Sequence, residues 1–239
     1  GAGSNLLVRD GGFRGLIIKL GKSFNNLALN NNFIHVGASI LDFNLSRFAL
    51  SNSLSNLEFF SGIPGSVGGA IKMNAGCYGS ETKDVLEKVS LITKNGKKRN
   101  LYKKELNLDY RNSNLTTKDI ITSAVFKADF GEKEKIKIII KNIKYKREKY
   151  QPLKTKTGGS TFKNPKGFYA AKLIEESDCK GLNVGDAQVS DKHANFIINH
   201  NKATAKDIED LGKIVQDKVY KKFDICLDWE IKIIGESSE

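Results

Sequence analysis

The sequence is poor in the residues that build metal sites and disulfide frameworks, with three cysteines and three histidines among 239 residues. Cys77, Cys179 and Cys226 are far apart in the chain and form no CxxC pair. An odd number of scattered cysteines fits a reducing compartment and argues against both a disulfide framework and a zinc site. The histidines show no metal-ligand spacing, and we interpret them as ordinary hydrogen-bonded side chains. We therefore expect no metal ion.

Long apolar runs are also absent. No stretch of about 18 consecutive apolar residues occurs, so the sequence predicts no membrane-spanning helix and no membrane partner. With 39% hydrophobic and 28% charged residues, the chain is long enough to bury a core in one large or two small domains. Together with the cysteine usage, this composition favours a cytoplasmic protein.

Acidic residues are outnumbered, because 39 Lys and Arg face 27 Asp and Glu and give a net charge of +12. Such a charge raises nucleic acid or an anionic ligand as a partner. However, the basic residues are not interleaved with the aromatic side chains that stack on bases. The joint richness in Lys, Asn and Ile is that of an AT-rich genome. We therefore expect no nucleic-acid partner.

Hydrophobic periodicity predicts an α+β protein. The expected strands are 5–8, 15–20, 33–38, 88–94, 119–128, 195–199 and 230–234. The expected helices are one capped by Ser39, one over 133–148, one over 168–178 closed by Gly181, and one that starts at a capping box of Thr204 and Asp207. The boundary between two domains is expected near Gly131, which gives domains over 1–131 and 132–239.

Glycine is concentrated in two stretches, Gly1–Asn5 and Gly62–Gly69. Successive glycine-containing segments let backbone N–H groups form a nest for a phosphate. Neither stretch is followed by the Gly-Lys-Ser/Thr of a P-loop, and neither has the strand–GxGxxG–helix context of a Rossmann fold. The glycines could instead mark tight bends between strands. Because two stretches occur, with a third at 74–78, we favour a dinucleotide or pyrophosphate ligand.

Six motifs occur in an order that makes the chain recognisable: GAGSNLLVRDGGFRG, GIPGSVGGAIKMNAGCYGSE, DYRNS, GGSTFKNP, GDAQVSDKHANFIIN and WEIKIIG. Together they resemble the UDP-N-acetylenolpyruvoylglucosamine reductase (MurB) family, from residue 1 to about residue 235. The resemblance implies an FAD-binding domain of the vanillyl-alcohol-oxidase/PCMH type over 1–131. It implies a smaller α+β substrate-binding domain over 132–239.

The resemblance also implies an activity. Family members are NADPH-dependent flavoenzymes that reduce the enolpyruvyl group of UDP-N-acetylglucosamine enolpyruvate to UDP-N-acetylmuramate, in the synthesis of peptidoglycan precursors. FAD and NADPH are the implied cofactors, a nucleotide-sugar is the implied small-molecule substrate, and we expect a monomer. The residues implied to bind FAD are Gly3, Ser4, Asn5, Leu6, Gly62, Ile63, Pro64, Gly65, Ser66, Gly68, Gly69, Asn74, Ala75, Gly76 and Tyr78.

The implied chemistry needs a cation for the substrate carboxylate and a proton source for a carbon atom. By resemblance, Arg111 binds the carboxylate, Ser160 donates the proton and Glu230 stabilises the enolate-like intermediate. Tyr110 and Asn164 are implied to contact the substrate. Taken alone, these residues would be interpreted as a surface arginine, a turn serine and an edge carboxylate.

Two departures from the family pattern are visible. Relatives normally carry a strand–helix–strand unit before the GAGSN loop, so we expect this sequence to be incomplete at its N-terminus. The alternatives are then a truncated inactive remnant, or another FAD-linked oxidoreductase on the same fold, which would lack DYRNS, GGSTFKNP and WEIKIIG. The segment between Asn164 and Gly185 is short, which predicts the shorter type of the family.

Overall fold

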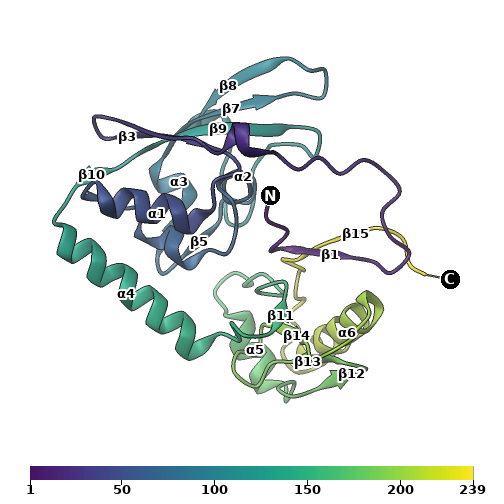
Figure 1. Ribbon diagram of the computed structural model, residues 1–239. Coiled ribbons are helices and arrows are strands. Elements are labelled where there is room, and N and C mark those ends of the chain that lie inside the picture. Colours follow the sequence, from purple (N-terminus) through teal and green to yellow (C-terminus); the bar gives the residue numbers. More distant parts are fainter. Residues whose placement is uncertain (239) are drawn as a thin grey trace. The chain divides into compact units, whose positions relative to one another are not determined.

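The computed structural model describes residues 1–238, and the chain divides into two compact units (Figure 1). Unit 1 contains residues 1–3 and 18–145, and unit 2 contains residues 4–17 and those from 146 onward. No helix within residues 1–238 is long and apolar enough to cross a lipid bilayer.

Unit 1 is built on a five-stranded antiparallel sheet with the strand order β2-β3-β9-β7-β8. These strands are β2 (Leu27–Asn30), β3 (Phe33–Gly37), β7 (Leu86–Ile92), β8 (Lys98–Tyr102) and β9 (Ile120–Lys127). Alternate residues of β3, Ile34 and Val36, point into the core, as a sheet with one buried face requires. The short helices lie to one side of this sheet (Figure 1).

The helices and short strands of unit 1 fill the connections. They are α1 (Asp42–Ser51), β4 (Leu54–Ser55), α2 (Val67–Lys72), β5 (Gly76–Cys77), β6 (Ser80–Glu81), α3 (Thr82–Val85), β10 (Asp129–Phe130) and α4 (Lys133–Tyr150), of which the last five residues belong to unit 2. The 3-10 turns are η1 (Lys22–Phe24), η2 (Glu58–Gly62) and η3 (Lys103–Glu105). Phe60 of η2 packs edge-on against Phe126 of β9, with 5.4 Å between the ring centroids, and this contact helps anchor the turn that leads into the glycine-rich segment.

Unit 2 combines a four-stranded antiparallel sheet, in the order β11-β14-β13-β12, with two helices and a separate parallel pair of strands. The sheet strands are β11 (Lys156–Thr157), β12 (Asn183–Val184), β13 (Ala187–Val189) and β14 (Ile197–Asn199), the helices are α5 (Ala170–Glu176) and α6 (Ala205–Phe223), and the parallel pair is β1 (Leu6–Val8) with β15 (Lys232–Ile234). A Cβ at Gly212, in the middle of α6, would lie 2.1 Å from the Trp229 ring. The helix therefore uses glycine there to admit the indole.

The N-terminus of α6 is capped from two places in the chain. Locally, Thr204 and Asp207 form the predicted capping box, with the Asp207 N–H donating to Thr204 Oγ1 over 3.0 Å. The carboxylate of Asp10 accepts from the N–H groups of Ala205 and Lys206 over 3.0 and 3.1 Å. The Thr204 N–H donates to Asp207 Oδ2 over 2.9 Å, so all four N–H groups that a helix start leaves unpaired are satisfied. Within unit 2, this capping fixes the segment after β1 onto α6.

Contacts between residues divide the chain after residues 3, 17 and 145, whereas the sequence predicted one boundary near residue 131. Ile136 and Ile143 of α4 are buried, and a Cβ at Gly62 would lie 3.1 Å from Ile143, so most of this helix packs within unit 1. At the other end, β1 pairs with β15 and so belongs to unit 2. Hydrophobic periodicity reports only local structure, so it predicts neither the packing of α4 within unit 1 nor the pairing of β1 with β15.

Several local predictions are corrected. No strand forms over 15–20, where Leu16 is 84% exposed, and strand β2 was missed. Helix α1 has its N-cap at Leu41 rather than at Ser39, and α5 has its C-cap at Ser177 rather than at Gly181. The glycine-rich segment, expected to be one loop, contains α2. The other predicted strands and helices form, with ends shifted by a few residues.

Candidate active site

The segment Gly62–Gly69 runs beside residues 38–41 within unit 1. The N–H groups of Val67 and Gly68 donate to the carbonyl oxygens of Ile40 and Ala38, both over 2.9 Å. These two N–H groups are therefore not part of a phosphate nest, contrary to the expectation for this stretch. A Cβ at Gly68 would lie 3.1 Å from the Cβ of Ala38, which is closer than ordinary van der Waals contact, so glycine suits this position. Glycine at position 68 thus allows the backbone of this segment to lie close to that of residues 38–41.

Ser66 and Gly69 nevertheless leave an unpaired hydroxyl and space beside it. The Oγ of Ser66 is buried and has no hydrogen-bond partner among residues 1–238. A Cβ at Gly69 would meet only this oxygen, at 3.6 Å, so a larger residue would fit unless another molecule occupied the space. A Cβ at Gly1 would lie 3.2 Å from the same oxygen. Because an unpaired buried hydroxyl is costly, this cradle fits a phosphate-bearing cofactor such as FAD.

Asn74 lies in the same stretch, but its side chain is used by the protein. The residue is fully buried and adopts the left-handed conformation with φ of 44°. Its amide nitrogen donates to Glu81 Oε2 over 2.7 Å and to the carbonyl oxygen of Asp109 over 3.0 Å, while its oxygen accepts from the Lys83 N–H over 2.8 Å. Cofactor binding by Asn74 thus remains a prediction for its backbone, and its side chain shapes the loop.

The DYRNS motif forms a tight turn that is hydrogen-bonded to residues 72–76 within unit 1. Arg111, with φ of 52°, donates from Nη2 to the carbonyl oxygen of Gly76 over 3.0 Å. Ser113 Oγ donates to the carbonyl oxygen of Lys72 over 2.6 Å. The Arg111 guanidinium carbon lies 5.0 Å from the Tyr110 ring centroid. Unit 1 therefore brings Tyr110 and Arg111 together with Gly76, one of the predicted flavin residues.

Unit 2 brings the segments of Ser160 and Glu230 together with residues 4–5 of the first glycine-rich stretch. The N–H of Glu230 donates to the carbonyl oxygen of Thr161 over 2.8 Å, so the segments that carry Ser160 and Glu230 are paired. The Asn5 amide donates to the carbonyl oxygen of Glu230 over 3.0 Å. A Cβ at Gly159, whose φ is 86°, would lie 4.0 Å from the Ser4 carbonyl oxygen. The segments that carry Ser160 and Glu230 thus contact Ser4 and Asn5, which are predicted to bind the pyrophosphate.

Asn164 has a structural contact as well. Its Oδ1 accepts from the N–H of Ala170 over 2.9 Å, at the start of α5. A contact of Asn164 with the substrate stays a prediction.

Two buried acids, Asp42 and Glu58, lie close to the glycine-rich stretch Gly62–Gly69. Asp42 is fully buried, and its N–H donates to the carbonyl oxygen of Gly65 over 3.1 Å. Burial raises the pKa of the Asp42 carboxyl well above its usual range. Burial also raises the pKa of Glu58. Sequence patterns gave no signal for either residue, because an acid at a helix start is usually exposed.

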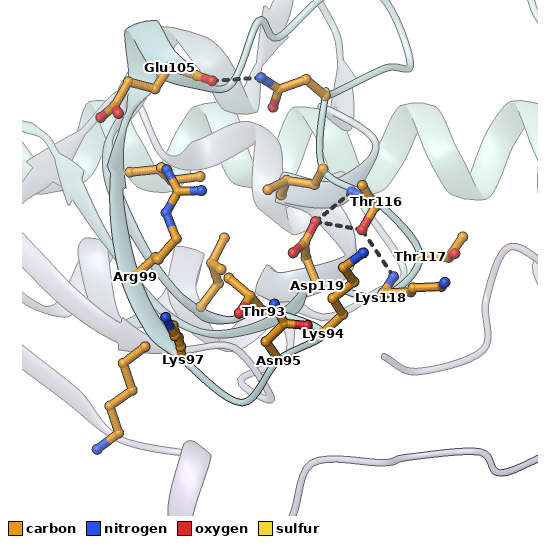
Figure 2. Close-up of a pocket in the computed structure, with 15 residues that line it drawn as sticks. Thr93, Lys94, Asn95, Lys97, Arg99, Glu105, Thr116, Thr117, Lys118 and Asp119 are labelled. Atoms are coloured by element: carbon orange, nitrogen blue, oxygen red, sulfur yellow. Dashed lines mark hydrogen bonds between the residues drawn. The ribbon is translucent and has the colours of Figure 1, made fainter.

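A pocket of about 840 Å³ in unit 1 contains none of the predicted site residues (Figure 2). It is lined by the β7–β8 hairpin and residues 114–119, and Lys94, Lys97, Arg99 and Lys118 are among its side chains. Asp119 accepts hydrogen bonds from the N–H and Oγ1 of Thr116, which lower the pKa of its carboxyl. Within residues 1–238, no group of three or more Cys, His, Asp or Glu is arranged to hold a metal ion.

Comparisons with known proteins cover both units. Residues 1–102 match the FAD binding domain family, and residues 151–234 match the UDP-N-acetylenolpyruvoylglucosamine reductase C-terminal domain family. The chain is 44% identical to the UDP-N-acetylenolpyruvoylglucosamine reductase of Rickettsia akari, over 99% of this chain and 80% of that protein. It is 45% identical to the Rickettsia bellii (strain OSU 85-389) protein of the same name, over 100% of this chain and 77% of that protein.

A solved structure agrees with these matches. The UDP-N-acetylenolpyruvylglucosamine reductase from Thermus caldophilus superposes with a TM-score of 0.88 and 38% sequence identity, covering 97% of this chain and 83% of that one. The α+β fold with an FAD-binding domain expected from the motifs is thereby confirmed. The chain belongs to the UDP-N-acetylenolpyruvoylglucosamine reductase family.

Proposed function

We propose that this chain is an NADPH-dependent flavoenzyme that reduces the enolpyruvyl group of UDP-N-acetylglucosamine enolpyruvate and forms UDP-N-acetylmuramate. The observation that carries this proposal is the pairing of the Ser160 and Glu230 segments through Thr161, in a chain with 44% identity to a reductase of that name. No comparison favours an inactive remnant or a different flavin-linked oxidoreductase.

FAD would be held by the phosphate loop Gly3–Leu6, by the cradle of Ser66 and Gly69, and by the backbone of residues 74–78. When bound, FAD supplies the hydride, which originates from NADPH. The Ser66 hydroxyl gains the hydrogen-bond partner that it lacks within residues 1–238. Leu6 belongs to β1, so the phosphate loop leads directly into a strand that is paired with β15.

Arg111 has the chemistry to hold the substrate carboxylate. Its guanidinium stays charged and offers a planar fork of N–H donors, which matches the two oxygens of a carboxylate. One of these nitrogens is already oriented by the Gly76 carbonyl oxygen. The charge also stabilises the electron density that moves toward the carboxylate when a hydride adds to the alkene carbon farther from it. Tyr110 and Asn164 would contact other parts of the same substrate.

Ser160 would deliver the proton. Hydride addition to one alkene carbon leaves negative charge on the adjacent carbon, and a positioned donor must protonate that carbon. A serine hydroxyl is a weak acid, so it depends on the electrostatic field of its neighbours. Glu230, whose segment is paired with the segment after Ser160, would stabilise the enolate-like intermediate.

The cellular role follows from this reaction. The product is a precursor of peptidoglycan, so the enzyme would support cell-wall synthesis and, through it, cell shape and division. The three free cysteines suit a reducing cytoplasm. We propose a monomer that binds no nucleic acid, since the net charge of +12 is not accompanied by base-stacking aromatic residues.

The test is a two-step optical assay on the purified chain, reconstituted with FAD. NADPH should bleach the flavin absorbance, and UDP-N-acetylglucosamine enolpyruvate should restore it with formation of UDP-N-acetylmuramate. A matched sugar nucleotide without the enolpyruvyl group, UDP-N-acetylglucosamine, should not restore it. Bleaching without recovery on addition of the enolpyruvyl substrate would contradict the proposed substrate, and failure to bind FAD would contradict the flavoenzyme assignment for this chain.

A further inference from the structure

Asn195 is a buried asparagine in the motif GDAQVSDKHANFIIN. The proposed reaction gives this residue no role. It is 4% exposed. Its Oδ1 accepts from the N–H of Phe162 over 2.9 Å, and its Nδ2 donates to the carbonyl oxygen of the same residue over 2.8 Å. One side-chain amide therefore pairs with both backbone groups of a single residue, as an antiparallel neighbouring strand would.

Thr161, the residue between Ser160 and Phe162, is held from the same side. Its N–H donates to the carbonyl oxygen of Asn195 over 2.8 Å. Its Oγ1 accepts from the N–H of Ile197 over 3.1 Å, at the start of β14. Thr161 is fully buried, so four hydrogen bonds fix residues 161–162 to residues 195–197.

The opposite edge of this short segment faces Glu230. The Thr161 carbonyl oxygen accepts from the Glu230 N–H over 2.8 Å, and the Lys163 N–H donates to the carbonyl oxygen of Asp228 over 2.8 Å. Residues 161–163 thus lie between the motif that contains Asn195 and the strand entry that contains Glu230. The position of Ser160, which directly precedes them, depends on both edges.

We infer that Asn195 is a positioning residue that sets Ser160 in register with Glu230 for proton delivery, an inference that rests on the proposed function. Phe162 is 1% exposed, so without the amide its N–H and C=O would be buried and unpaired. The segment would relieve that cost by shifting, and Ser160 would move with it. A displacement of about 1 Å is enough to cost about 10²-fold in rate.

The test uses Asn195→Ala in the FAD-loaded chain, with the two half-reactions followed separately by stopped-flow absorbance. Flavin bleaching by NADPH should stay within about twofold of the unmodified chain, because it needs no proton from Ser160. Recovery with the enolpyruvyl substrate should slow by about 10- to 100-fold at saturating substrate, with little change in KM. Hydrogen exchange should show faster exchange of the Phe162 N–H, a readout that does not depend on activity.

Asn199→Ala is the matched control. Asn199 lies in β14, shortly after Asn195, and its side-chain amide makes three hydrogen bonds, which go to Asn201 and Ala203 in the following turn. This variant should leave both half-reactions and the exchange of Phe162 unchanged. Asn195→Ser provides a second, less disruptive variant with a smaller effect in the same direction.

The outcomes separate this inference from the proposed function. If the unmodified chain fails to react with the enolpyruvyl substrate, the proposed function is overturned. If the unmodified chain reacts but Asn195→Ala shows normal recovery, or slows both half-reactions equally, the role of Asn195 is overturned alone. Loss of folding in both Asn195 variants, with Asn199→Ala intact, would make Asn195 a residue of general stability and would also overturn the inference.

Discussion

Arg111 donates from Nη2 to the carbonyl oxygen of Gly76 over 3.0 Å. The cation proposed to bind the substrate carboxylate is therefore attached to the segment proposed to bind the flavin. Asn74, Tyr78 and Arg111 all have positive φ, from 44° to 54°, although none is glycine. Backbone strain of this kind persists where the surrounding structure imposes it and is frequent at functional sites.

Arg111→Lys should weaken use of the substrate carboxylate. Lysine keeps the charge but loses the planar fork, and a hydrogen bond to a charged group is worth about 1.5–3 kcal/mol. We expect kcat/KM for the enolpyruvyl substrate to fall by about 10- to 100-fold, while flavin reduction by NADPH changes little. Arg47→Lys, on the surface helix α1, is the control and should behave like the unmodified chain. Equal loss in both half-reactions would contradict the assignment of Arg111 to the carboxylate.

Ser66→Ala should separate cofactor affinity from stability. Because Ser66 Oγ has no partner within residues 1–238, its removal should leave the melting temperature of the apoprotein unchanged or slightly higher. The Kd for FAD should rise by about tenfold or more, through the lost hydrogen bond to a charged group. Ser61→Ala is the counter-example, since Ser61 Oγ donates to the Glu58 carbonyl oxygen over 2.7 Å and its removal should lower stability instead. A destabilised Ser66→Ala apoprotein with normal FAD affinity would show that the hydroxyl serves the fold.

Gly69→Ala should raise the stability of the apoprotein and lower its affinity for FAD. Gly69 lies within α2, where alanine is favoured over glycine by about 0.8–1.0 kcal/mol, and its Cβ would make only an ordinary contact of 3.6 Å with Ser66. The apoprotein should therefore become more stable, while FAD binds less tightly because the cradle is partly filled. Gly69→Val should abolish FAD binding. Titration of flavin fluorescence measures both variants, and unchanged affinity in Gly69→Val would place the cofactor elsewhere.

Asp42→Asn should change how stability depends on pH. Burial raises the folded-state pKa of Asp42 well above its usual range. The protonated carboxyl makes its full contribution to the free energy of unfolding at pH values below the unfolded-state pKa. That contribution is lost as pH rises through the folded-state pKa. The asparagine amide in the variant cannot ionise, so the variant should gain in urea midpoint over the unmodified chain as pH rises from about 5 to about 8. Asp129→Asn, an exposed control, should show no such gain. A difference that is independent of pH would mean that Asp42 does not titrate as described.

Local chemistry explains what could be predicted from the sequence. The capping box of Thr204 and Asp207 and the amphipathic helix now seen as α4 follow from neighbouring residues, and the motifs alone indicated the family. The second cap of α6 by Asp10 could not be predicted, because the two are 195 residues apart in the chain. The pairing of β1 with β15 is also a long-range contact, and it places residues 6–8 with the C-terminal residues in unit 2.

The candidate site shows the same limit. Arg111, Ser160 and Glu230 were named from family motifs, and their roles remain predictions. The supporting residues were missed: Thr161 and Asn195 act through backbone groups and buried amides, and the sequence ANFIIN indicates only a strand. A polar residue flanked by apolar ones in such a strand is the one available signal, since a buried asparagine requires partners.

The most direct test of the account is Ser160→Ala, followed by stopped-flow absorbance of the flavin. Reduction by NADPH should proceed near its normal rate, because no proton is delivered to a substrate carbon in that step. Reoxidation by UDP-N-acetylglucosamine enolpyruvate should slow by about 10²–10⁴-fold, the usual contribution of a positioned acid, with substrate affinity little changed because Arg111 remains. Normal reoxidation in the variant, or equal slowing of both steps, would contradict the assignment of Ser160 as the proton donor.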